Sequence, residues 1–132
     1  MRGKGDMSEF FISPSKPPEL NESINYRIDP SEYALQMRQQ WPDAKIVDLT
    51  TGGYVLHWEL NRKGRLGLSG GLQSNGLVVN FASGPQADVI EFVLWHRAFV
   101  PSRISLYLFD ANLDLVIELK PGIRKEDLTS SI

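Results

Sequence analysis

The chain contains no cysteine. This absence excludes disulfide bonds, a thiol nucleophile and every zinc site that needs a cysteine ligand. Histidine is scarce too, with two residues in 132, and neither occurs in a His-x-x-x-His or Glu-x-x-His pair. The "GLSGG" stretch lies in a strand pattern and not before a helix, so it does not predict a phosphate loop. We therefore expect no metal and no cofactor.

A strong positive charge is also missing. The 14 Lys and Arg are scattered, and the 16 Asp and Glu leave a net charge of −2, so we expect no nucleic-acid partner. No apolar run has the length of a signal peptide or of a membrane-spanning helix. The sequence thus predicts a soluble, cytoplasmic protein that does not associate with membranes.

The pattern of apolar residues predicts two longer helices and six strands. "DPSE" opens the first helix, because Asp29 suits the N-cap and Pro30 the first helical position, and Pro42 ends it. Period-two alternation and turn signals such as Asn75-Gly76 predict the strands. In chain order the expected elements are a helix over 29–41, strands over 44–50, 54–61, 66–73 and 77–82, a helix over 83–101, and strands over 104–109 and 113–119, before a short terminal helix.

This order predicts the α+β class: an antiparallel sheet of about six strands with helices on one face, a two-layer sandwich. Residues 1–25 are interpreted as an N-terminal arm, because prolines at 14, 17 and 18 disfavour a regular element. The apolar "EFFI" within the arm is free to dock on the body. Residues 26–132 are expected to form one α+β domain, and deletion of residues 1–22 is expected to leave it folded.

The second helix has two apolar faces on a helical wheel. The branched aliphatic residues, such as Val89 and Val93, are expected to face the sheet. An aromatic stripe points elsewhere, with two acidic residues beside it. Either the arm or the first helix covers this stripe, or it binds another protein or a second copy of the chain. The predicted partner-binding residues are Phe92, Trp95, Phe99, Asp88 and Glu91.

A second candidate surface lies on the polar face of the strands over 54–82. Gly67 and Gly71 are expected to point outward and to leave a shallow trough between larger neighbours. His57 would act there as a base oriented by Glu59, since residues two apart on a strand share a face. The predicted ligand face consists of His57, Glu59, Ser69 and Asn80.

These observations favour a non-enzymatic protein-binding module. In its size, acidity and α+β pattern the chain is similar to small bacterial immunity proteins and antitoxins, which neutralise a toxin or effector, and this likeness rests on fold-level analogy alone. The alternatives are a chaperone of secreted effectors, a homodimeric module, and a small-ligand-binding or hydrolytic enzyme that uses the trough.

Overall fold

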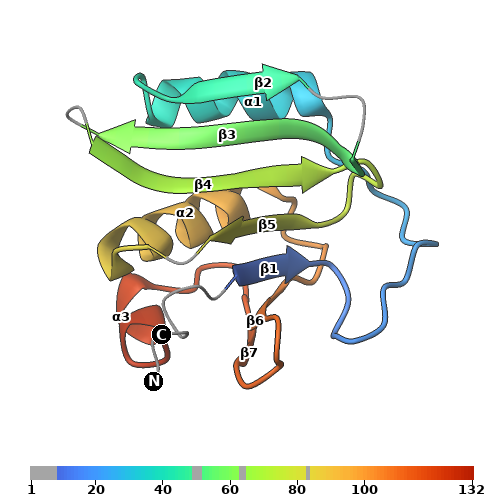
Figure 1. Ribbon diagram of the computed structural model, residues 1–132. Coiled ribbons are helices and arrows are strands. Elements are labelled where there is room, and N and C mark those ends of the chain that lie inside the picture. Colours follow the sequence, from blue (N-terminus) through green and yellow to red (C-terminus); the bar gives the residue numbers. More distant parts are fainter. Residues whose placement is uncertain (1–8, 49–51, 63–64, 83) are drawn as a thin grey trace.

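One antiparallel sheet forms the framework of the protein (Figure 1). The computed structural model describes residues 9–48, 52–62, 65–82 and 84–132. The strands in chain order are β1 (Glu9–Ser13), β2 (Lys45–Asp48), β3 (Tyr54–Arg62), β4 (Arg65–Gln73), β5 (Val79–Ala82), β6 (Tyr107–Asp110) and β7 (Val116–Glu118). They lie side by side in the order β2-β3-β4-β5-β1-β6-β7.

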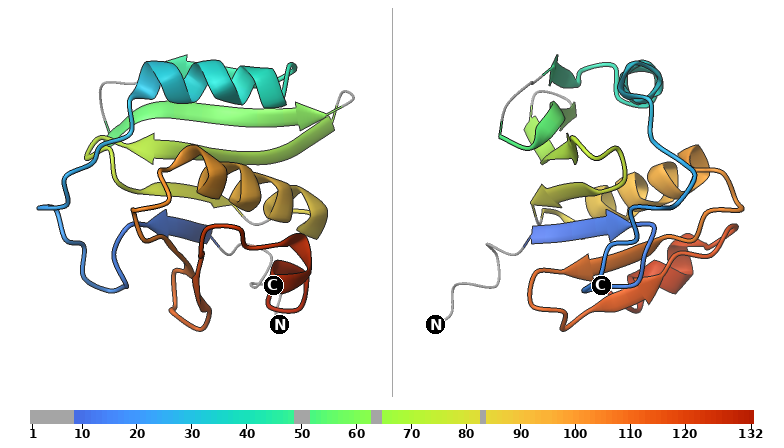
Figure 2. Two further views of the ribbon diagram at one scale, coloured as in Figure 1. Left: turned by 180° about the vertical axis from the view of Figure 1, so that it is seen from behind. Right: turned by 90° about the vertical axis from the view of Figure 1, so that its right-hand side faces the viewer.

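The helices are α1 (Pro30–Gln40), α2 (Gln86–Phe99) and the short α3 (Lys125–Thr129). α1 and α2 lie on the same side of the sheet, behind it in Figure 1 and in front of it in the left-hand view of Figure 2, and α3 contacts α2. The buried core fills the space between these helices and the sheet, with Trp58, Phe81 and Phe92 among its largest side chains. The predicted α+β class with an antiparallel sheet is confirmed, and the sheet has seven strands.

The seventh strand comes from the segment that the sequence indicated as an arm. β1 lies between β5 and β6 (Figure 1). It therefore joins the meander formed by β2, β3, β4 and β5 to the C-terminal hairpin formed by β6 and β7. Phe10 pairs with Phe81, and Ile12 is fully buried. A deletion of residues 1–22 would therefore remove a strand from inside the sheet, and the expectation of a folded remainder does not fit this topology.

The predicted start of α1 and one predicted hairpin turn agree with the structure. The Asp29 side chain accepts a hydrogen bond from the Ser31 amide at 3.1 Å, which satisfies one of the free amides of the first turn. Gly76 has φ of 72°, and the Asn75 side chain accepts from two amides that follow it, which closes the turn between β4 and β5. α2 is preceded by Pro85, which occupies its N-cap position.

Two register shifts between β3 and β4 change which way nearby residues point. The first, between Tyr54 and Leu56, places the Tyr54 ring over Gly71 on the opposite face from the buried Leu56. The second, after Leu60, leaves Gly67 against Asp88 of α2, so Gly67 does not point outward as predicted. Simple alternation fails at both positions because a bulge adds one residue to one strand only.

A buried arginine holds the end of α2 to the chain that follows β7. Arg97 donates to the carbonyls of Val100 and Pro101 at 3.2 and 2.8 Å, and to that of Leu119 at 2.9 Å. Burial lowers the pKa of Arg97. Its guanidinium thus satisfies three carbonyls beyond the end of the helix, where the helix dipole also favours a positive charge.

Candidate functional site

The aromatic stripe of α2 does not face away from the sheet. Phe92 is fully buried, and its ring centre lies 4.9 Å from that of Phe81 and 5.7 Å from that of Trp58. Both partners belong to strands of the sheet. The prediction that this ring points elsewhere is therefore wrong, because Phe92 packs against the Phe81 and Trp58 rings of the sheet.

The other two rings of the stripe are covered by α1 and the residue that follows it. Trp95 and Phe99 are partly buried, with their ring centres 5.0 and 4.9 Å from Tyr33 in edge-to-face contacts. Trp41 contacts Trp95 at 5.3 Å. Of the alternatives that the sequence left open, the structure shows cover within the chain, by the first helix.

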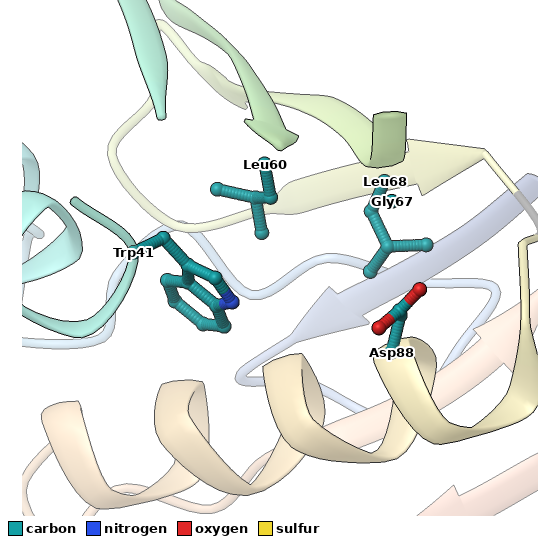
Figure 3. Close-up of a pocket in the computed structure, with 5 residues that line it drawn as sticks. All are labelled: Trp41, Leu60, Gly67, Leu68 and Asp88. Carbon is teal, nitrogen blue, oxygen red and sulfur yellow. The ribbon is translucent and has the colours of Figure 1, made fainter. Parts of the chain in front are cut away.

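The two acidic residues beside the stripe are also engaged within the chain. Asp88 is 9% exposed, and Glu91 accepts a hydrogen bond from Gln40 of α1 at 2.9 Å. Asp88 borders a cavity of about 10 Å³ whose remaining lining is Trp41, Leu60, Gly67 and Leu68 (Figure 3). A cavity of this size holds at most about one water molecule, so it does not form a ligand site.

His96 is buried next to this aromatic cluster. Its Nδ1 lies 2.8 Å from the Tyr33 hydroxyl, while its Nε2 and the Trp58 Nε1 have no hydrogen-bond partner in the described part of the chain. Burial, with a smaller effect of the neighbouring Arg97 charge, lowers the pKa of His96 to about 3. The ring is therefore neutral in the folded protein at every pH near neutrality, and it serves the packing between α1 and α2.

This depressed pKa predicts a loss of stability in mild acid. The unfolded chain binds a proton at His96 below pH ~6.5, whereas the folded chain does not until about pH 3, so the free energy of unfolding falls as pH decreases through this range. The expected decrease from His96 between pH 7 and pH 5 is about 2 kcal/mol, measurable by urea unfolding.

This measurement compares a double variant with a control. The double variant combines His96→Phe with Tyr33→Phe, so that no buried hydroxyl is left unpaired. The control is His57→Gln, at the exposed histidine. The double variant should lose this pH dependence, and His57→Gln should keep it. An unchanged slope in the double variant would show that other groups cause it.

The opposite face of the sheet carries no described helix and is turned toward the viewer in Figure 1. The strand pairings place one residue of each strand in a single row across this face. We call the helix-free surface around this row the open face. The row runs Val47, His57, Gly71, Asn80, Phe11, Phe109 and Val116.

Aromatic side chains lie within this open face. Phe11 of β1 and Phe109 of β6 stack with ring centres 5.4 Å apart and planes 14° apart. Both are half-buried, and the adjacent Val116 is 42% exposed. The open face therefore has an apolar part over β1, β6 and β7 that no described helix covers.

A shallow polar pocket of about 180 Å³ adjoins this apolar part. The Tyr54 ring lies so close over Gly71 that a Cβ there would sit 2.8 Å from the ring. The side chains that line the pocket come from β1, β3, β4 and β5: Glu9, Tyr54, His57, Ser69, Asn80 and Ala82. Three of the four residues predicted as a ligand face, His57, Ser69 and Asn80, are thus brought together.

A chain of hydrogen bonds orders the floor of this pocket. Asn80, only 4% exposed, donates from Nδ2 to the Glu9 carboxylate and accepts from Gln73 at 3.3 Å. Glu59, the fourth predicted ligand residue, does not line the pocket. None of the contacts described for the chain joins Glu59 to His57, so the structure does not show the predicted oriented base.

Sequence reasoning missed four residues of the open face: Glu9, Phe11, Tyr54 and Phe109. The alternation in "EFFIS" was the available signal, since Phe10 and Ile12 face the core while Glu9 and Phe11 face outward. The prolines that follow this short segment obscured the signal.

Fold and site together define an antiparallel α+β protein with one sheet face covered by helices and the other open. Comparison of the chain with protein-family models, with curated proteins and with solved structures gives no match. Among the described residues, no helix is long and apolar enough to cross a membrane. The same residues contain no group of three or more acidic or histidine side chains placed to hold a metal ion.

Proposed function

We propose that this protein is a non-enzymatic protein-binding module and that its binding surface is the open face of the sheet. One observation carries this proposal: a stacked pair of phenylalanines, Phe11 and Phe109, is only partly buried on the side without helices. Aromatic rings flanked by polar side chains are typical of the centre of protein interfaces.

The dimensions of the open face support this choice. Its row crosses seven strands, and six spacings of about 4.8 Å give a width of roughly 29 Å. A standard interface, which covers about 800 Å² on each partner, has a similar width. The pocket within the face, at about 180 Å³, is smaller than the roughly 300 Å³ at which small-molecule sites begin, so the extended surface fits a protein better than a whole ligand.

The narrower form of this proposal is an immunity protein or antitoxin whose partner is a toxin or effector. It rests on the fold-level analogy, as does the effector-chaperone alternative. The two differ in outcome, since an immunity protein abolishes the activity of its partner and a chaperone leaves it intact after release. A homodimer through the open face would appear as a doubled mass in solution.

A small-ligand or hydrolytic site in the pocket is the second candidate, favoured by the convergence of His57, Ser69 and Asn80 there. In that case His57→Ala should abolish binding or turnover of a small ligand and leave partner binding unchanged. If the protein-binding proposal is right, the effect of His57→Ala should instead be confined to partner affinity.

The proposal is tested with two matched surface variants. A partner captured by the wild-type chain is identified and purified, and its affinity is measured for Val116→Lys on the open face and Leu35→Lys on α1. Both positions are exposed, at 42% and 52%, so both variants should fold. We expect at least tenfold weaker binding, about 1.4 kcal/mol, for Val116→Lys alone.

The control variant decides the interpretation of that result. If Leu35→Lys weakens binding and Val116→Lys does not, the partner binds on the helical side and the proposal is wrong. Equal, small losses in both variants would also contradict it, since a charge change at any site would then suffice.

A further inference from the structure

We propose that the polar pocket of the open face binds the basic end of one arginine or lysine side chain of the partner protein. This inference rests on the proposed function, because it assigns a subsite within the same surface. It goes further by giving the chemistry that the partner must bring to the pocket.

The first argument is the charge and order of the pocket wall. Glu9 contributes a carboxylate, and none of the residues that line the pocket in the described chain is Lys or Arg. Asn80 donates to this carboxylate and is itself held by Gln73, so the acceptor is fixed in direction before a partner arrives. A carboxylate that is already fixed loses less side-chain entropy when it forms a charge-assisted hydrogen bond.

The second argument is the aromatic ring of Tyr54, which lines the pocket. The Tyr54 ring lies so close to Gly71 that a side chain there would collide with the Cδ1 and Cε1 atoms of the ring. A cation within about 6 Å of an aromatic ring centre is attracted to the ring face. A carboxylate and an aromatic ring in the lining of one pocket together favour a planar guanidinium or an ammonium group, and Ser69 adds a hydroxyl acceptor.

The third argument is the size of the pocket. A volume of about 180 Å³ corresponds to about six water molecules at roughly 30 Å³ each. This space accommodates the charged end of one long side chain and a few methylene groups. It lies beside the Phe11–Phe109 pair, because Asn80 and Phe11 are paired neighbours on β5 and β1, so an inserted basic side chain would stand next to the apolar anchor.

The test is an NMR titration of the isotope-labelled full-length chain with N-acetyl-arginine amide, N-acetyl-lysine amide and the neutral isostere N-acetyl-citrulline amide. We expect saturable shifts at Ser69, Gly71 and Asn80 with at least one cation, at millimolar affinity. Citrulline should bind at least tenfold more weakly, since it keeps the shape and loses the charge.

Two variants complete the test. Glu9→Gln should weaken cation binding at least tenfold, while Glu19→Gln, at an exposed site outside the pocket, should leave it unchanged. Equal binding of citrulline, retained binding in Glu9→Gln, or no saturable shift with either cation would overturn the inference. In each of those cases an effect of Val116→Lys on partner affinity would still support the proposed function, so the two failures are distinguishable.

Discussion

Deletion of residues 1–13 is expected to abolish the cooperative unfolding of the protein. The deletion removes β1 from between β5 and β6 and leaves both of those strands with an unpaired edge. It also removes Phe10 and Ile12 from the core, and burial of each such side chain contributes about 1.5–3 kcal/mol. With two strand pairings lost as well, the total is comparable to the roughly 5–15 kcal/mol that stabilises a typical domain.

The control for this deletion is a peptide of residues 1–18 added in trans. Added to the truncated chain, the wild-type peptide should restore a cooperative thermal transition by circular dichroism, and a peptide with Ile12→Asp should not. A truncated chain that melts cooperatively without any peptide would show that β1 is dispensable, as the sequence alone suggested.

Gly70→Ala is expected to destabilise the fold by about 3 kcal/mol or more. A Cβ at this position would collide with the Asn80 carbonyl and would lie 2.8 Å from the Phe81 Cβ. Both obstacles belong to the paired strand β5, so relief requires the sheet itself to shift. The gain from a stiffer unfolded chain, about 0.4–1 kcal/mol, is too small to offset this.

Ser69→Ala is the matched control, because it changes the adjacent residue of β4 on the open face. Its free energy of unfolding should lie within about 0.5 kcal/mol of wild type. Denaturant midpoints of the two variants measure the difference. A Gly70→Ala variant as stable as Ser69→Ala would mean that β4 and β5 do not pair in this register.

Local pattern was enough to predict most of the elements. Asp29 and Pro30 define the start of α1, and the Asn75-Gly76 turn joins two strands that pair as expected. Turn geometry and capping depend on neighbours in the sequence, so a single chain reveals them. The bulges at Tyr54 and Leu60 were not predicted, because a bulge depends on how the strand pairs with its partner strand.

The position of β1 could not be predicted for a different physical reason. Five residues give too short a period-two signal, and their pairing partners lie about 70 and 100 residues further along the chain. Which strands accept such a segment depends on the edges that the meander and the hairpin leave open. That information exists only in the tertiary structure.

The candidate site shows the same division between local and long-range information. Alternation along β3, β4 and β5 correctly grouped His57, Ser69 and Asn80. Glu9 and Phe11 belong to β1, and they lie beside this group because β1 pairs with β5. A helical wheel separates the two apolar faces of α2 without saying which one meets the sheet. Phe92 packs on the sheet and α1 covers Trp95, so the aromatic stripe is part of the core.

Hydroxyl-radical footprinting of the free, full-length chain, read by mass spectrometry, tests most directly whether the open face is the exposed aromatic surface. Comparing phenylalanines only removes differences in intrinsic reactivity. We predict faster oxidation of Phe11 and Phe109, which are half-buried, than of Phe81 and Phe92, which are fully buried. Oxidation of Phe92 as fast as that of Phe109 would contradict this account, because it would place the stripe of α2 on the outside of the protein.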